Sequence, residues 1–464
     1  MSTVTAGRAS PVSRRRRPRT LSRALWSLSL AALLALGAVF AFTDSAVSDA
    51  RGGLKVIGHG AGPQAIATAD LYYALSDMDV QIAGILLLGR ERNLGIGRDQ
   101  AMSRYEQDRD QADRAALQAA ELAGSDPAGQ RSVRFVLYSL GRYERLTDQA
   151  VVLDDQSGHP AGPAPQNVIS IYRQAAAVMK VDLLPGAYNL TLDAGSVVRH
   201  GYLVRRDAVL AGRIPVAVAG GALIALLAGL QVLCAARFRR LINPALLLAT
   251  LGAAALLATT LVLLTDEAEH LTAAKTSGFD ATLALSRARA LGNRAVADES
   301  RYLLDPGHAD IDTETYLDES QAVLYVPADS IGQYDAAIGP AVAAGTGFLG
   351  FLGDEARGTP VPGGRGALAS VLAAYQRFQR DDRQMRALGS RRDATAVKVG
   401  VLRSDFDLYD AALVSLTARH QAALTSAIRA GDDELGGWSL LPVAVLALAA
   451  VVIGGVAPRL WEFH

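Results

Sequence analysis

Four stretches of this 464-residue chain contain no charged side chain and are long enough to cross a lipid bilayer: residues 24–43, 214–236, 241–265 and 438–457. A hydrocarbon core about 30 Å thick needs about 20 residues of apolar helix, so each stretch is a candidate span. Two polar segments, residues 44–213 and 266–437, lie between the first and second stretches and between the third and fourth. Because two crossings separate the polar segments, both must lie on the same side of the membrane.

The arginines predict which side that is. Residues 1–23 form a basic tail with seven arginines and no acid, and the turn 237–240 contains Arg237, Arg239 and Arg240. The C-terminal residues 458–464 add Arg459 and a single acid, Glu462. Short basic flanks stay in the cytoplasm. We therefore expect a multi-pass protein of the cytoplasmic (plasma) membrane, with both termini cytoplasmic and both polar segments extracytoplasmic.

The first apolar stretch has a second interpretation, as a cleaved signal peptide. Its apolar run exceeds the usual signal core of about 7–15 residues, and no clear Ala-x-Ala site precedes a polar start. Cleavage would also leave one polar segment on the side that the arginines assign to the cytoplasm. We favour an uncleaved anchor. The single cysteine, Cys234, lies in the second stretch, so neither polar segment can form an internal disulfide.

Both polar segments have the periodicity of helices. Leu71, Leu75, Met78, Ile82 and Ile85 recur at alternating spacings of four and three residues, which is typical of a helix that buries one face. Clusters of glycine and proline divide each segment into helical regions. The sequence predicts an all-α membrane protein: four transmembrane helices and two extracytoplasmic four-helix-bundle domains of the sensor type. The helices that end at Asp305 and begin near Gln166 and Asp393 are expected to be continuous with spans.

The two polar segments resemble each other on their third predicted helix. Residues 139–149 read SLGRYERLTDQ and residues 374–384 read AYQRFQRDDRQ. Arg142 aligns with Arg377, and Tyr143 aligns with Phe378. We infer a duplication of the order span, bundle, span. Arg142 and Arg377 are candidates for contacts to a carboxylate ligand or a partner, although a solvent-facing arginine beside a core aromatic residue is the simpler interpretation.

The chemistry of an enzyme or a metal site is not evident. The seven histidines are scattered along the chain, and no phosphate-binding glycine loop precedes a helix. His308, Asp310 and Asp312 lie in one loop but lack the glycine and closing glutamate of a calcium loop. Asp77 and Asp79 lie two residues apart on a predicted helix, where their side chains diverge. We expect no catalytic residue, no metal site and no cofactor. The spans also lack the mid-membrane charges typical of transporters.

The whole chain resembles the GlnX-type membrane proteins of actinobacteria. The resemblance covers the four spans, both polar segments, and sequences such as ADLYYALSDMDVQIAGILLLG (69–89) and ADESRYLLDPG (297–307). It implies a membrane protein that acts between a solute-binding lipoprotein for glutamate or aspartate and the cytoplasmic Ser/Thr protein kinase G. It does not identify ligand or kinase contacts.

A chain with two external helical domains and little cytoplasmic sequence is expected to act through partners. We predict a non-enzymatic transmembrane signal relay that couples the amino-acid-binding protein outside to the kinase inside. Arg237, Arg239 and Arg240 are the candidate contacts for the cytoplasmic partner. The alternative is a scaffold of the cell envelope that transmits no signal. No nucleic-acid partner is expected beside the lipid bilayer, and the oligomeric state, a homodimer included, stays open.

Overall fold

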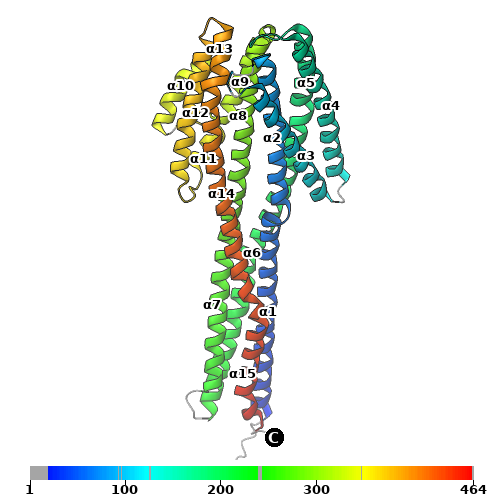
Figure 1. Cartoon of the computed structure of the whole chain (residues 1–464). Helices are drawn as coiled ribbons and strands as arrows, with labels where there is room; N and C mark the ends of the chain where they lie inside the picture. The colour runs from blue at the N-terminus through cyan, green and yellow to red at the C-terminus, as the bar shows by residue number, and fades with distance from the viewer. Residues whose placement is uncertain are drawn as a thin grey trace, which may run out of the picture. The chain divides into compact units, whose positions relative to one another are not determined.

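The computed structural model describes residues 19–91, 94–95, 97–124, 127–238, 243–345 and 347–461. It is 90% helical, and the described residues form no strand. Their one isolated β-bridge joins Tyr325 to Leu349. The prediction of an all-α protein is confirmed (Figure 1).

The first part of the chain forms six α-helices, which are α1 (Arg19–Gly58), α2 (Ala61–Leu88), α3 (Arg98–Ala123), α4 (Pro127–Ser157), α5 (Gln166–Ala177) and α6 (Leu184–Phe238). The second part forms α7 (Pro244–Ala273), α8 (Ala281–Leu304), α9 (Ala309–Val323), α10 (Ile331–Ala344), α11 (Gly350–Arg357), α12 (Gly364–Arg386), α13 (Arg391–Val397), α14 (Arg403–Gly437) and α15 (Leu441–Trp461). Two short 3₁₀ turns, η3 (Pro306–His308) and η5 (Trp438–Leu440), join neighbouring helices.

Three of the helical runs contain a π-helical segment. These segments are η1 (Val178–Leu183) between α5 and α6, η2 (Ala274–Asp280) between α7 and α8, and η4 (Lys398–Leu402) between α13 and α14. A residue that weakens the α-helix accompanies each: Pro185 follows η1, Gly278 lies in η2, and Gly400 lies in η4. Proline lacks the N–H for an i→i−4 bond, and the wider turn before Pro185 accommodates that loss without ending the helix.

The described residues divide into two compact units. The membrane unit consists of described residues within Met1–Arg51, Asp207–Ala268 and Asp433–His464, and the polar unit consists of those within Gly52–Arg206 and Glu269–Asp432. The polar unit therefore draws on both polar segments of the sequence. The sequence predicts two bundles, whereas the described residues of both segments pack around a shared hydrophobic core.

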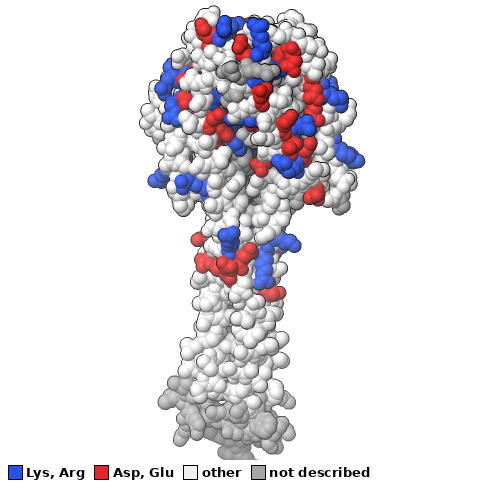
Figure 2. Space-filling model, in the orientation of Figure 1, with Lys and Arg blue, Asp and Glu red and all other residues white. Residues whose placement is uncertain are grey.

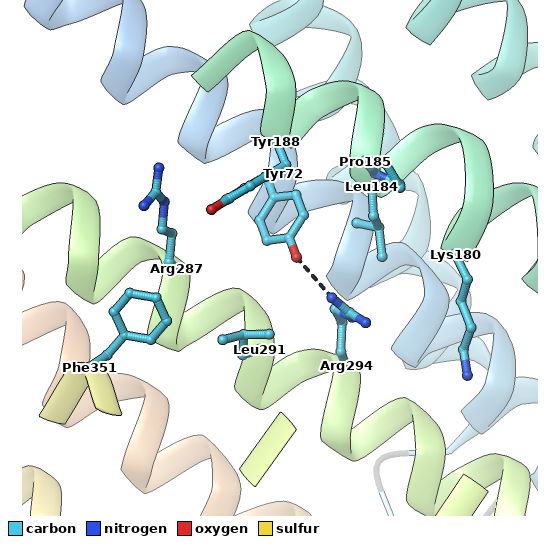
Figure 3. Close-up of a pocket in the computed structure, with 9 residues that line it drawn as sticks. All are labelled: Tyr72, Lys180, Leu184, Pro185, Tyr188, Arg287, Leu291, Arg294 and Phe351. Carbon is cyan, nitrogen blue, oxygen red and sulfur yellow. Dashed lines mark hydrogen bonds between the residues drawn. The ribbon is translucent and has the colours of Figure 1, made fainter. Parts of the chain in front are cut away.

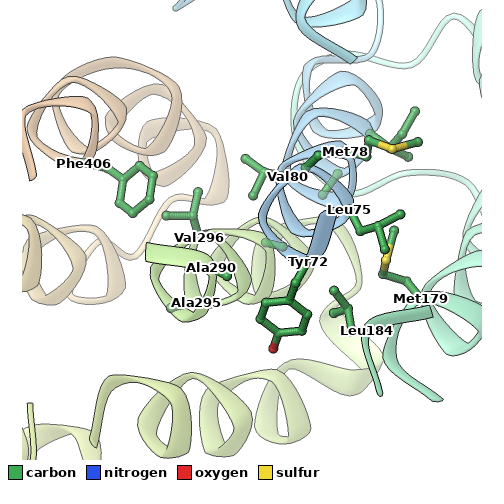
Figure 4. Close-up of a cluster of buried hydrophobic side chains, with 14 of the residues drawn as sticks. Tyr72, Leu75, Met78, Val80, Met179, Leu184, Ala290, Ala295, Val296 and Phe406 are labelled. Carbon is green, nitrogen blue, oxygen red and sulfur yellow. The ribbon is translucent and has the colours of Figure 1, made fainter. Parts of the chain in front are cut away.

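The helix α2 shows why the two segments join. Leu71, Leu75, Met78, Ile82 and Ile85 are each at most 1% exposed, as the predicted stripe requires. Other faces of α2 are also buried, because α2 packs against α3 on one side and against α8 of the second segment on another. A helix that is apolar around most of its circumference must be enclosed. Figure 4 shows side chains of α2 and α8 meeting in this core.

The membrane unit holds the apolar stretches. Each of four helical runs contains a window long and apolar enough to cross a membrane. Its core consists mainly of leucine and alanine side chains of α1, α6 and α7 and valine side chains of α15. Gln231 on α6 donates a hydrogen bond to Thr250 on α7 over 2.9 Å, a polar contact of the kind that stabilises helix pairs in lipid. In the view of Figure 2, charged side chains are scattered over the polar unit, and most of the described surface of the membrane unit shows none.

Candidate functional site

Two adjacent carboxylates on α8 anchor a buried network of charges in the polar unit. Asp298 and Glu299 are both 0% exposed. Lys180 of η1 donates a hydrogen bond to Oδ1 of Asp298 over 2.9 Å, and Lys398 of η4 donates one to Oε2 of Glu299 over 2.5 Å. Successive side chains on a helix point about 100° apart. The two carboxylates therefore tie α8 to two different π segments.

Arg301 extends the network to further helices. Its Nη1 donates to Oδ2 of Asp79 on α2 over 2.6 Å, and its Nη2 donates to Asp298 one turn earlier on α8. Tyr172 on α5 donates to the other oxygen of Asp79 over 3.4 Å, and Asp312 on α9 lies 3.6 Å from the Nε of Arg301. The rigid fork of one guanidinium can hold several acceptors at once. Arg301 thus fixes the positions of four helices relative to one another.

Burial and pairing act in opposite directions on these carboxyl groups. Burial acts to raise the pKa of Asp298, but neighbouring cations, Arg301 first among them, outweigh it and lower that pKa. Burial raises the pKa of Glu299 to about 8, although Lys398 acts to lower it. Burial likewise raises the pKa of Asp312 to about 6 against the effect of Arg301. The network therefore contains carboxyl groups that titrate near neutral pH beside one that stays ionised.

A pocket of about 330 Å³ opens beside this network (Figure 3). We call it the basic aromatic pocket, and its lining residues are Tyr72, Lys180, Leu184, Pro185, Tyr188, Arg287, Leu291, Arg294 and Phe351. They come from α2, η1, α6, α8 and α11. Arg287, Leu291 and Arg294 follow one another at spacings of four and three residues, which places them on one face of α8.

Hydrogen bonds and ring contacts order the pocket. Arg294 donates from Nη1 to the hydroxyl of Tyr72 over 3.1 Å, and its Nη2 lies 2.7 Å from Oε1 of Glu319. The guanidinium of Arg287 lies over the ring of Tyr188, 4.9 Å from the ring centre. The rings of Tyr72 and Tyr188 lie 6.0 Å apart. Cations and aromatic walls in one concave site suit a ligand with a negative group and an apolar body.

The structure places Arg142 and Arg377 away from this pocket. Arg142 on α4 lies 3.6 Å from Asp182 of η1, and Arg377 on α12 lies 4.0 Å from Asp405 on α14. Their side chains are 51% and 44% exposed. The aromatic neighbours Tyr143 and Phe378 are buried, so the two arginines have the arrangement of solvent-facing residues beside a core. Both arginines therefore lie near an aspartate on a helical run that contains a candidate span. This shared arrangement in the two polar segments fits a duplication.

The cytoplasmic candidates are only partly visible. Arg237 belongs to the last turn of α6, while Arg239 and Arg240 lie outside the described residues. Most of the basic N-terminal tail also lies outside them.

The acidic residues that the sequence analysis weighed as cation ligands have other partners. His308 lies 3.5 Å from Asp305, and Asp312 faces Arg301. Asp77 and Asp79 diverge on α2, as expected, since Asp79 binds Arg301 and Asp77 interacts with Asp108 of α3. Within the described part of the chain, no group of three or more His, Cys, Asp or Glu side chains could hold a metal ion.

The sequence analysis did not single out Lys180, Arg287, Arg294 or Arg301. The one available signal was a charge within an apolar helical face: Arg301 lies in ADESRYLLDPG, and Arg287 and Arg294 flank Leu291 at helical spacing. Such spacing is equally common on solvated faces, so only tertiary contacts distinguish these residues.

A family model described as the actinobacterial sensor domain matches residues 53–202. This range lies within the first polar segment and includes five of the nine pocket residues. No curated protein matches the chain. Together with the four apolar helices, the match fits a membrane protein with an actinobacterial sensor domain, and a sensor domain suggests a role in signalling.

Proposed function

We propose that this protein is a non-enzymatic transmembrane signal relay whose polar unit receives a signal outside the cytoplasm and whose spans transmit it inward. One observation carries the proposal. The helical runs that build the charge network and the pocket also contain the candidate spans. Gln166–Ala235, Pro244–Leu304 and Arg391–Ala457 are continuous helical runs, and they include Lys180, Asp298 and Lys398 respectively.

Continuity matters because an α-helix is stiff along its axis. A displacement of about 1–2 Å at one end can reach the other end as a shift or rotation. Each continuous run contains a π segment, and π segments inside α-helices are frequently found at functional sites. The lysines of η1 and η4 are bonded to adjacent carboxylates of α8. A rearrangement of that network would therefore move several runs together.

The partners in this proposal come from the resemblance to GlnX-type proteins. The outer partner is a solute-binding lipoprotein for glutamate or aspartate, and the inner partner is Ser/Thr protein kinase G. Basic side chains at the cytoplasmic turn suit an acidic surface of the kinase. Replacing Arg237, Arg239 and Arg240 with glutamine is expected to weaken kinase association, with the other arginines kept to preserve topology.

The decisive experiment interrupts one helix between the two units. Two glycines inserted between Arg213 and Ile214 break the continuity of α6, because glycine is a poor helix former. Two alanines inserted at the same point form the matched control. They rotate the following part of α6 about the helix axis as the two glycines would, but they keep the helix continuous. We expect the glycine variant to retain binding of the outer partner and to lose the response of kinase substrate phosphorylation to glutamate or aspartate.

The control separates two mechanisms. If the alanine variant keeps a response, of either sign, that the glycine variant lacks, transmission requires a rigid helix. An unchanged response in the glycine variant, with the protein still in the membrane, would refute the relay and favour the envelope scaffold.

A further inference from the structure

The basic aromatic pocket contains a cation with no ionic partner among the residues that the structure describes. Lys180 is paired with Asp298 and Arg294 with Glu319, whereas Arg287 forms no ion pair with any residue that the structure describes. The guanidinium of Arg287 lines the pocket. An anion bound there would give it the ionic partner that the described residues do not supply.

The walls of the pocket restrict what else the ligand carries. Tyr72, Tyr188 and Phe351 supply ring surfaces, and three aliphatic side chains, Leu184, Pro185 and Leu291, complete the lining. Figure 3 shows Arg287 and Phe351 at one end and Lys180 at the other. The volume of about 330 Å³ is near the lower limit of small-molecule sites. A small ligand with a flat apolar body fits these walls.

We propose that the pocket binds a small monocarboxylate with an apolar, planar body, with its carboxylate on Arg287 and its body between Tyr188 and Phe351. One unpaired guanidinium matches one negative charge, and its planar fork matches a carboxylate. A dianion such as phosphate would exceed that charge and leave the apolar walls unfilled. A free amino acid is disfavoured because its ammonium group would face the cations of the pocket.

The binding proposal rests on the proposed function only for the effect that ligand binding would have on signalling. Binding itself is measured without the kinase or the lipoprotein. The full chain in nanodiscs of zwitterionic lipid is titrated calorimetrically with phenylacetate, and empty nanodiscs correct for partition into lipid. Phenylacetamide, phenylalanine and inorganic phosphate serve as the neutral, zwitterionic and dianionic probes. We expect binding of phenylacetate and at least about tenfold weaker binding of the other three.

Variants locate the site. Arg287→Gln is expected to weaken phenylacetate binding by about tenfold or more, because a charged hydrogen bond is lost. Arg365→Gln removes an exposed arginine at the start of α12 and should change nothing. Leu291→Trp keeps every charge but fills the pocket, and it should abolish binding even if Arg287→Gln fails to fold.

Three results would each overturn the proposal. These are no phenylacetate binding up to about 10 mM, equal binding of phenylacetamide or phenylalanine, and unchanged binding in both Arg287→Gln and Leu291→Trp. Failure of the glycine insertion to affect signalling would leave these binding results untouched, so the two proposals fail separately.

Discussion

Individual buried acids with raised pKa values are expected to make the stability of this protein depend on pH. Asp108 on α3 and Asp77 on α2 are neighbouring carboxyl groups that interact through a side-chain hydrogen bond. Burial first, and then the adjacent Asp77, raise the pKa of Asp108 to about 8 against the opposing effect of Arg403. Two carboxylates at close range cannot both ionise cheaply, so the pair retains a proton at neutral pH.

The sign of the pH dependence follows from that shift. The pKa of Asp108 in the folded protein, about 8, lies above its ordinary value of 3.8. Its protonated form therefore stabilises the fold fully below about pH 4, and this contribution disappears as the pH rises through 8. We predict that Asp108→Asn, which mimics the protonated group, is more stable than the wild type at about pH 9 by about 1–2 kcal/mol, allowing for solvent screening.

At about pH 4 the same variant should match the wild type, since both then carry a neutral group. The midpoint of thermal unfolding, measured against pH in neutral detergent, checks this prediction. Asp110→Asn removes an exposed carboxylate two residues away on α3 and is the control. Parallel pH curves for Asp108→Asn and the wild type would contradict the assignment.

At the scale of elements, the π segments η2 and η4 each contain a glycine, but the two glycines differ in how closely other helices pack against them. A Cβ atom added to Gly278 in η2 would lie 2.7 Å from the Cβ and 2.8 Å from the Cα of Leu424 on α14. A Cβ atom added to Gly400 in η4 would meet no atom within 4 Å. The two glycines therefore have different roles. Gly278 permits close approach of two helical runs, whereas Gly400 only weakens its own helix.

We predict opposite effects of alanine at these two positions. Gly278→Ala should lower the free energy of unfolding by about 1–3 kcal/mol, because backbone atoms of α14 must move. Gly400→Ala should raise it by about 0.5–1 kcal/mol, because alanine restricts the unfolded chain and favours helix. Thermal unfolding of both variants under one condition gives the comparison. Equal destabilisation by the two substitutions would show that packing at η2 is not the cause.

At the scale of the whole molecule, the shared core gives a reason for the predicted topology. Two segments that pack together as one polar unit must lie on the same side of the membrane. The even number of crossings between them satisfies this requirement. The arginine bias predicts that this side is extracytoplasmic.

Cysteine labelling tests that topology. In a Cys234→Ala background, cysteines at Ser157 and Thr359, both exposed, should react with a membrane-impermeant thiol reagent in intact cells, whereas one at Ser13 should react only after lysis. Thr359 is chosen over Gly363 in the same loop, because Gly363 has a φ of 71° and an added Cβ would meet the Arg419 guanidinium at 2.5 Å. Different accessibility of Ser157 and Thr359 would refute the shared side.

The sequence by itself predicted four candidate spans, the helical class and several helix ends. The run through the third span ends at Leu304, next to the predicted end at Asp305, and α5 begins at Gln166, as predicted. These features are local. The length of an apolar run fixes a span, and glycine or proline ends a helix through its own backbone. The stripe from Leu71 to Ile85 is equally local.

Only the tertiary structure decided which faces meet. It paired α2 with α8 across the two polar segments, buried Asp298 and Arg301 together, and placed Arg287 in a pocket while leaving Arg142 and Arg377 half exposed. A charged residue at helical spacing has the same pattern on a solvated face as in a buried network. The difference is the desolvation that neighbouring helices impose, and residues distant in the sequence supply it.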